Sequence, residues 1–190
     1  GKLKEAISSY EKALSLKPDY AKAYYNMGIA FQKQLKRYEA IDAYKKALLI
    51  KSDYAEAYNN MGIVCADQGN IKEAIASYEK ALLIKPDYAE AYNNMGVIYQ
   101  EKRELKKAIE FYKKALSVRP NYAEAYTNIG IVCADQGNLE EAIESCEKAL
   151  SIKPDYAEAY NSLGVAYQKK FNLKEAISSY EKALSIKPDH

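Results

Sequence analysis

The sequence repeats itself every 34 residues. Segment 89–96 reads Ala-Glu-Ala-Tyr-Asn-Asn-Met-Gly, and near-copies of it begin at positions 21, 55, 123 and 157. A fixed period of this length indicates one supersecondary unit stacked on copies of itself, each contacting mainly its neighbours. The chain therefore divides as a single array into a half-repeat and five full repeats. These are 1–20, 21–54, 55–88, 89–122, 123–156 and 157–190.

Each full repeat carries two helical patterns separated by a polar turn. In the repeat 89–122, apolar residues recur at helical spacing in both halves. The second pattern ends before a proline in most repeats, as at Pro120, because proline cannot continue a helix. The turn contains Gly69 or Gly137 in two repeats, as expected just after a helix end. The sequence thus predicts an all-α fold, an α-solenoid of helix–turn–helix units.

Small residues at fixed positions predict close helix packing. Each first helix contains a glycine, such as Gly96, where glycine costs about 1 kcal/mol relative to alanine. Each second helix begins near an alanine, such as Ala108, and we expect glycine to face this alanine so that the two backbones approach closely. A second alanine series, represented by Ala115, is expected to admit the first helix of the next repeat.

Residues at fixed offsets in every repeat resemble the tetratricopeptide repeat (TPR). In the third repeat they are Tyr92, Met95, Gly96, Tyr99, Ala108, Tyr112, Ala115 and Pro120. The resemblance covers the whole chain, although tyrosine replaces the usual first tryptophan, and Cys65 and Cys133 replace the second aromatic residue in two repeats. It implies a right-handed superhelix whose first helices line the concave face. It also implies a non-catalytic scaffold for protein–protein interaction.

The repeats also alternate in pairs. Repeats two and four share the segment Gly-Ile-Val-Cys-Ala-Asp-Gln-Gly-Asn, whereas the other three carry an aromatic residue followed by Gln32, Gln100 or Gln168. This pattern suggests that a two-repeat block was duplicated.

We predict that a polar row on the first helices, the asparagine ladder, binds an extended peptide. An asparagine amide offers donors and an acceptor that match the C=O and N–H groups of a peptide backbone. The alternative is a purely structural role for asparagine at this position. The ladder consists of Asn26, Asn60, Asn94 and Asn128, continued by Ser162.

Three further rows lie near the ladder. A second amide row either lies beside the ladder or faces solvent at the groove edge. An apolar row suits alternate side chains of an extended ligand, or else packs adjacent first helices together. Acidic residues would make the groove favour basic segments, unless they form a solvated helix face. The second amide row contains Asn59, Asn93 and Asn161; the apolar row contains Ile63, Val97 and Ile131, with Ile29 and Val165; the acidic residues include Glu56, Glu90, Glu124 and Glu158.

Composition argues against several other functions. The formal net charge of +2 creates no long-range field that would recruit nucleic acid or an anionic membrane. No stretch approaches the roughly 18 apolar residues of a membrane span, and we expect a cytoplasmic protein. The only histidine is His190, and we find no Gly-rich phosphate loop and no nucleophile–base pattern. We therefore expect no enzyme activity, no cofactor and no metal site.

Cysteine usage predicts buried reduced thiols. Cys65 and Cys133 occupy the same repeat position two repeats apart, too far to form a disulfide bond. Cys146 stands where the other repeats have tyrosine. A disulfide bond between Cys133 and Cys146, on facing helices of one repeat, is the alternative.

Two alternative functions remain. The segments Asn-Asn-Met-Gly, Gly-Asn-x-x-Glu-Ala-Ile and Lys-Pro-Asp-Tyr-Ala-Glu-Ala-Tyr are similar to the repeats of protein O-GlcNAc transferases and Spindly proteins. That resemblance implies that the asparagine ladder holds acceptor proteins for a glycosyltransferase domain. Alternatively, the terminal half-repeats are nearly identical and no polar helix caps them, which suggests end-to-end self-association or a consensus-like structural array.

Overall fold

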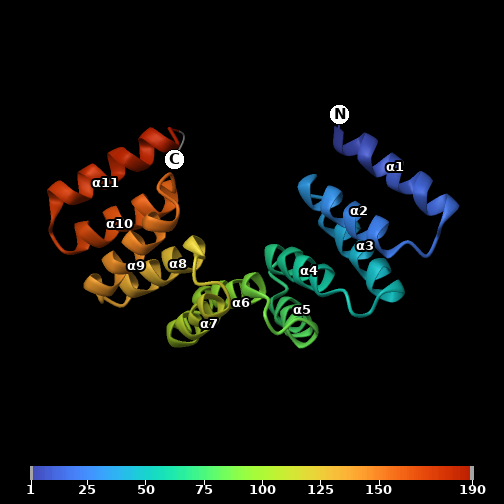
Figure 1. Ribbon diagram of the computed structural model, residues 1–190, viewed down its shortest axis with the longest axis horizontal. Coiled ribbons are helices and arrows are strands. Elements are labelled where there is room, and N and C mark those ends of the chain that lie inside the picture. The colour runs from blue at the N-terminus through green and yellow to red at the C-terminus, as the bar shows by residue number, and fades with distance from the viewer. Residues whose placement is uncertain (1, 189–190) are drawn as a thin grey trace. The chain divides into compact units, whose positions relative to one another are not determined.

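The computed structural model describes residues 2–188, and within this range all regular structure is helical (Figure 1). The predicted all-α solenoid class is confirmed, while the handedness of its superhelix stays a prediction. The helices are α1 (Lys2–Leu16), α2 (Ala21–Lys33), α3 (Arg37–Ile50), α4 (Ala55–Asp67), α5 (Ile71–Ile84), α6 (Ala89–Glu101), α7 (Leu105–Val118), α8 (Ala123–Asp135), α9 (Leu139–Ile152), α10 (Ala157–Lys169) and α11 (Leu173–Ile186).

The helices belong to two compact units, Gly1–Asn94 and Met95–His190. In the first unit, α2 pairs with α3 and α4 pairs with α5, and α3 also contacts α4. In the second unit, α8 pairs with α9 and α10 pairs with α11, and α9 contacts α10 (Figure 1). The two first helices α8 and α10 also contact each other directly. Each unit therefore stacks helical hairpins in chain order.

At the joints between repeats, one short segment both ends a helix and begins the next. The N–H of Lys85 donates to the carbonyl of Ala81 at 2.8 Å, after which Pro86 stops α5. The ammonium group of Lys85 lies 4.7 Å from the ring centroid of Tyr88, a favourable cation–π contact. The same contact recurs in the second unit, where Lys153 lies 4.3 Å from the ring of Tyr156.

The first-helix glycine packs against a tyrosine ring rather than against the alanine that we expected. A Cβ atom added to Gly62 would lie 2.6 Å from the ring of Tyr78, and one added to Gly164 would lie 2.6 Å from the ring of Tyr180. The fourth repeat is different: a Cβ at Gly130 would meet Cys146 Sγ at 2.6 Å and the carbonyl oxygen of Ala142 at 3.1 Å. The large tyrosine ring leaves no room for a side chain on the facing helix, which explains the glycine in the repeats that have this tyrosine.

The second alanine series behaves as predicted. Ala81 on α5 is fully buried and belongs to one cluster with Ala55 of α4 and Ala91 of α6. In the second unit, Ala149 on α9 is buried in a cluster with Ala123 and Ala159. A small residue fits here because both helices of one hairpin and the first helix of the next repeat meet in the same cluster.

The turns inside the repeats use a left-handed backbone. Gly69 and Gly137 have φ angles of 76° and 81°, as glycine permits. The equivalent residues Leu35, Arg103 and Phe171 have φ angles of 59°, 60° and 62°, although L-residues with side chains pay about 1–2 kcal/mol in this region. These three turns are therefore locally strained.

Replacing Phe171 by glycine is expected to raise the free energy of unfolding by about 0.5–1 kcal/mol. The side chain is 86% exposed, so little burial is lost. Relief of the left-handed strain is partly offset by the greater flexibility of glycine in the unfolded chain. Chemical denaturation followed by circular dichroism measures the change. Gly137→Ala, the reverse substitution in a turn with open space, should lower stability; a destabilised Phe171→Gly protein would contradict the strain argument.

The three cysteines are free and buried, as predicted, rather than joined in a disulfide bond. Burial raises the pKa of the Cys133 thiol to about 11 and that of the Cys146 thiol to about 12. Burial likewise raises the pKa of Tyr156 to about 12. All three groups hold their protons more tightly in the folded chain than in the unfolded chain.

We expect the free energy of unfolding to fall as the pH rises above about 9. Unfolded thiols lose their protons near pH 9, whereas the folded thiols of Cys133 and Cys146 stay protonated up to pH 11–12. The unfolded state therefore binds fewer protons across this window, and stability declines with pH by roughly 2 kcal/mol or more. Urea unfolding at pH 7, 9 and 10.5 tests this. In a Cys133→Ala/Cys146→Ala protein, the free energy of unfolding should decline less steeply with pH. An equal decline in both proteins would show that these two thiols are not its cause.

Candidate functional site

All members of the asparagine ladder lie on first helices. Asn26 lies on α2, Asn60 on α4, Asn94 on α6 and Asn128 on α8, and each side chain is half-buried. Ser162 on α10 is buried, with 8% of its surface exposed. The ladder therefore forms part of the first-helix surface in each unit, but its side chains are only partly exposed to solvent, and Ser162 is buried.

In the first unit the ladder amides bond across repeats. Asn60 Nδ2 donates to the Tyr25 hydroxyl oxygen at 3.2 Å, and Asn94 Nδ2 donates to Asn59 Oδ1 at 3.0 Å. Asn59 Nδ2 in turn donates to Asn60 Oδ1 at 3.3 Å. These bonds form a continuous chain from α2 through α4 to α6. The ladder and the second amide row thus stabilise the stacking of first helices, using part of the hydrogen-bonding capacity of each amide.

The second amide row is mostly internal. Asn59 and Asn93 are 4% and 7% exposed, and Thr127, at the same repeat position, is 2% exposed. The idea that these residues face solvent at a groove edge is therefore wrong. Asn161 is the exception among the residues named, because its side chain is exposed on α10.

The bond that joins Asn94 to Asn59 has no counterpart between Ser162 and Thr127 in the second unit. Thr127 Oγ1 donates to the carbonyl oxygen of Ala123 at 3.0 Å, and Ser162 Oγ donates to that of Glu158 at 2.9 Å. Each hydroxyl thus returns to its own helix, four residues back. Thr127 and Ser162 occupy the positions that Asn59 and Asn94 hold in the first unit, but they do not reach each other.

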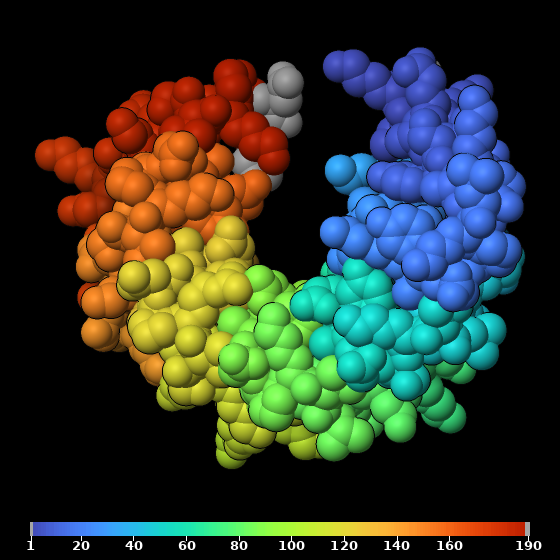
Figure 2. All heavy atoms as spheres, turned by 45° about the vertical axis from the view of Figure 1, so that its right-hand side comes forward, coloured from blue at the N-terminus to red at the C-terminus, as the bar shows by residue number. Residues whose placement is uncertain are grey.

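A hollow of about 230 Å³ lies beside Ser162, between α8 and α10. Its apolar walls come from Ile131, Ala134 and Val165, while Ser162 and Asn161 supply polar groups and Asp135 lies at one end. In the space-filling view, α8 (yellow) and α10 (orange) form a continuous surface (Figure 2). The volume is below the roughly 300–1,000 Å³ of small-molecule pockets, so it suits a single side chain.

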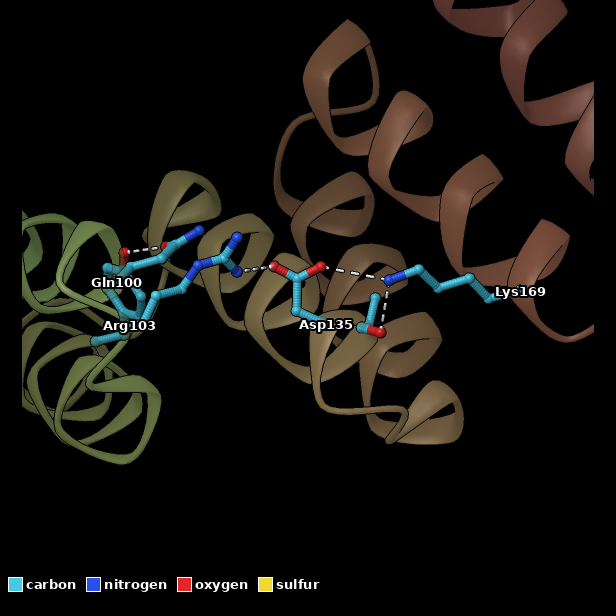
Figure 3. A network of polar contacts seen from close by, with 6 residues as sticks. Gln100, Arg103, Asp135 and Lys169 are labelled. Atoms are coloured by element: carbon cyan, nitrogen blue, oxygen red, sulfur yellow. Dashed lines mark hydrogen bonds and ion pairs between the residues drawn. The ribbon is translucent and has the colours of Figure 1, made fainter.

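Asp135 at the end of the hollow is held between two cations (Figure 3). Lys169 Nζ lies 3.3 Å from one carboxylate oxygen and also donates to the carbonyl of Ala134 at 2.8 Å. Arg103 Nη1 lies 3.8 Å from the other oxygen. Because all three side chains are substantially exposed, each pair contributes at most about 1 kcal/mol. The cluster carries two positive charges and one negative charge.

Other carboxylates of the first helices also pair with lysines of the chain. Glu56 lies 3.7 Å from Lys85, and Glu158 lies 3.5 Å from Lys187, each lysine directly preceding the proline of its repeat. Glu90 and Glu124 are half-buried. The acidic character that the sequence predicted is thus partly neutralised within the repeats.

The apolar row divides into two groups. Ile29 packs against the core cluster of Ala40, Tyr44 and Val64, and Val97 packs against the core cluster of the second unit. Ile131 and Val165 instead line the hollow. Ile63 is half-buried. Helix packing therefore accounts for part of this row.

A tyrosine–glutamine hydrogen bond is present in the three odd-numbered repeats. The hydroxyl groups of Tyr44, Tyr112 and Tyr180 donate to the glutamine Oε1 atoms of Gln32, Gln100 and Gln168 at 2.8, 2.6 and 2.9 Å. The fourth repeat has Cys146 and Ala134 instead, so there is no hydroxyl group to satisfy. Ala134 also leaves room that forms one wall of the hollow. The alternation is visible in the sequence, whereas this pairing was not predicted, although tyrosine follows glutamine by twelve residues in all three repeats.

Residues 2–188 contain neither a membrane-spanning helix nor a cluster of metal-binding side chains. None of the helices in this range is both long and apolar enough to span a membrane. The same residues contain no group of three or more His, Cys, Asp or Glu side chains that could hold a metal ion.

Stacked helical hairpins with a small-residue interface and proline-terminated second helices define an α-solenoid repeat protein. The model of the tetratricopeptide repeat matches residues 19–84, 53–121 and 121–189, and a further TPR model matches residues 1–34. This chain belongs to the tetratricopeptide repeat family. Among curated protein sequences, none matches it.

Solved structures of TPR proteins are similar to this chain. MamA is 32% identical, with a TM-score of 0.71, over 86% of this chain and 95% of MamA. YrrB, described as a TPR protein with an unusual peptide-binding site, is 28% identical, with a TM-score of 0.68, over 97% of this chain and 95% of YrrB. PilF from Pseudomonas aeruginosa shares the fold, at 22% identity and a TM-score of 0.79, over 87% of this chain and 75% of PilF.

Proposed function

We propose that this protein is a non-catalytic scaffold that binds an extended segment of a partner protein along its first helices. The observation that carries the proposal is the half-buried amide ladder of Asn26, Asn60, Asn94 and Asn128 beside half-buried apolar residues. An amide has two N–H groups and two acceptor lone pairs, so the internal bonds of Asn60 and Asn94 leave capacity for a peptide backbone. Side chains of the peptide would contact the apolar residues.

The similarity to YrrB supports a peptide ligand, since that protein is described as having a peptide-binding site. We propose neither nucleic acid nor a membrane as a partner, because the net charge is only +2. A preference for basic segments has weaker support than the sequence suggested. Glu56, Glu158 and Asp135 are already paired with lysines of the chain.

Two alternatives are kept as proposals. A substrate-recognition role beside a glycosyltransferase domain depends on the Asn-Asn-Met-Gly and related segments alone. Self-association through the terminal helices is consistent with Leu173 and Ile177 on α11, which are 60% and 59% exposed. Light scattering over a range of concentrations tests self-association, and a monomer at high concentration would exclude it.

The experiment is a pull-down from source lysate, read by mass spectrometry, followed by binding of segments of each recovered partner to the purified protein. The test variant is Asn60→Ala/Asn94→Ala/Asn128→Ala. The matched control is Asn70→Ala/Asn121→Ala/Asn138→Ala, which changes three exposed asparagines in turns. We expect partner segments to bind the wild type and the control at least tenfold more tightly than the ladder variant. Equal binding to all three proteins would exclude the ladder.

Asn60 and Asn94 also hold first helices together, so the ladder variant needs a folding control. Its circular dichroism spectrum and unfolding midpoint identify any general loss of structure. If it is unstable, the single variant Asn128→Ala, with Asn138→Ala as its control, carries the same comparison.

A further inference from the structure

We propose that the hollow between α8 and α10 is the specificity site of the second unit. It would bind an aliphatic side chain of a peptide that also carries a carboxylate near it. This inference rests on the proposed peptide-binding function and names the ligand chemistry that the function leaves open.

The repeat pattern is interrupted at two positions near the hollow. Ser162 replaces the ladder asparagine, and Thr127 replaces the amide that would bond to it. Ala134, the small residue of the even-numbered repeats, lines the hollow as well. In the first unit, the equivalent space is bridged by the bond from Asn94 to Asn59. The surface that the repeat normally fills with its own amides is thus open at α8 and α10.

The lining selects an aliphatic group. Ile131 and Val165 are half-buried on facing helices, and Ala134 is 4% exposed behind them. The hydroxyl group of Ser162 already donates to the carbonyl of Glu158, so it does not call for a polar ligand atom. Covering apolar side chains on both helices is favourable because it removes their CH₂ and CH₃ groups from water. The exposed amide of Asn161 lies at the same hollow and can pair with the peptide backbone.

The charges at the end of the hollow select a carboxylate. Arg103 is 79% exposed and touches Asp135 through one nitrogen at 3.8 Å, so most of its five N–H donors face solvent. Lys169 adds a second cation, and Asp135 compensates only one of the two. Among the nearby charges, Lys170 pairs with Glu140, whereas Glu104 pairs with both Lys102 and Lys107 and so leaves one further positive charge. A ligand carboxylate beside Arg103 completes the neutralisation and can accept a paired hydrogen bond.

The first unit provides an internal comparison. Leu35 stands at the repeat position of Arg103. Asp67, which corresponds to Asp135, instead lines a shallow surface with Lys36 and Arg37. The arginine at the turn position itself, Arg103, is found in the second unit, where the hollow between α8 and α10 also lies.

The test uses short synthetic peptides and methyl and amide NMR spectra of the full chain. Each peptide is a Gly-Ser sequence carrying one leucine, with one glutamate placed one, two or three positions before or after it. Matched peptides carry alanine for leucine or lysine for glutamate. We expect shifts at the methyl groups of Ile131 and Val165 and at the amide of Asn161. At least one leucine–glutamate peptide should bind about tenfold more tightly than its alanine partner and at least fivefold more tightly than its lysine partner.

Two variants make the test specific. Ser162→Asn installs the side chain that four other repeats carry, so it should fold, fill the hollow and lower affinity at least tenfold. Ser178→Asn makes the same change at an exposed position of α11 and should bind as the wild type does. Arg103→Glu should reverse the preference between the glutamate and lysine peptides, which a merely structural arginine would not do.

The outcomes separate this inference from the proposed function. Unchanged binding to Ser162→Asn, shifts confined to other helices, or no binding by any peptide of the panel would each overturn the inference. If recovered partner segments depend on the ladder asparagines but bind Ser162→Asn normally, the scaffold function stands and the specificity site is wrong. If partner segments also lose binding to Ser162→Asn, both are supported.

Discussion

Replacing Tyr112 by alanine is expected to lower the free energy of unfolding by about 3–5 kcal/mol, the largest single effect in the second unit. The ring is fully buried in a cluster with Ala108, Val132 and Cys133. It fills the space that Gly96 leaves on the facing helix. Its removal would leave a cavity between two helices and a glutamine without its donor. Guanidinium chloride unfolding followed by circular dichroism measures the loss.

Tyr112→Phe separates the ring from its hydroxyl group. The hydroxyl donates to Gln100 Oε1 at 2.6 Å, and Gln100 is half-buried, so water can replace the lost bond in part. We therefore expect a loss of only about 1 kcal/mol. If the phenylalanine variant were as unstable as the alanine variant, the hydrogen bond rather than the packing would be the main source of stability.

Replacing Gly62 by valine is expected to destabilise the first unit by about 3 kcal/mol. A Cβ atom there would lie 2.6, 2.9 and 3.0 Å from three atoms of the Tyr78 ring. That ring is only 2% exposed and cannot swing away without disturbing the core. The helix would have to separate from its partner, or the ring would have to leave its position. The same denaturation experiment reports the effect.

The control for this prediction is Gly69→Ala in the same repeat. Gly69 has a φ angle of 76° and open space around its Cβ direction, so only backbone strain is introduced. That strain costs roughly 1 kcal/mol. A loss at Gly62 no greater than the loss at Gly69 would show that the glycine–tyrosine contact is not tightly packed.

The sequence predicted the fold well because the relevant information is local and repeated. Helical spacing of apolar residues, prolines such as Pro120 and the turn glycine Gly137 act within a few residues of their own position. Five copies of the same pattern reinforce one interpretation. The helix pair of each repeat and the packing role of Ala81 and Ala149 followed directly.

The predicted partner was wrong for the glycines that face a tyrosine because two candidates were available, whereas Gly130 does approach the backbone of Ala142. Gly62 has an alanine and a tyrosine on the facing helix, at Ala74 and Tyr78, and both recur with the repeat. Only the relative rotation and offset of the two helices decide which of them contacts the glycine. The sequence pattern does not contain that offset.

The candidate site shows the same division. The sequence by itself determined that Asn60, Asn94 and Ser162 occupy equivalent positions on first helices. Only the tertiary structure decided that Asn94 bonds to Asn59, and that Ser162 instead bonds within its own helix beside a hollow. The ion pair of Arg103 with Asp135 likewise joins different repeats. Contacts of this kind depend on how neighbouring helices are displaced sideways, and that displacement is set by the packed core as a whole.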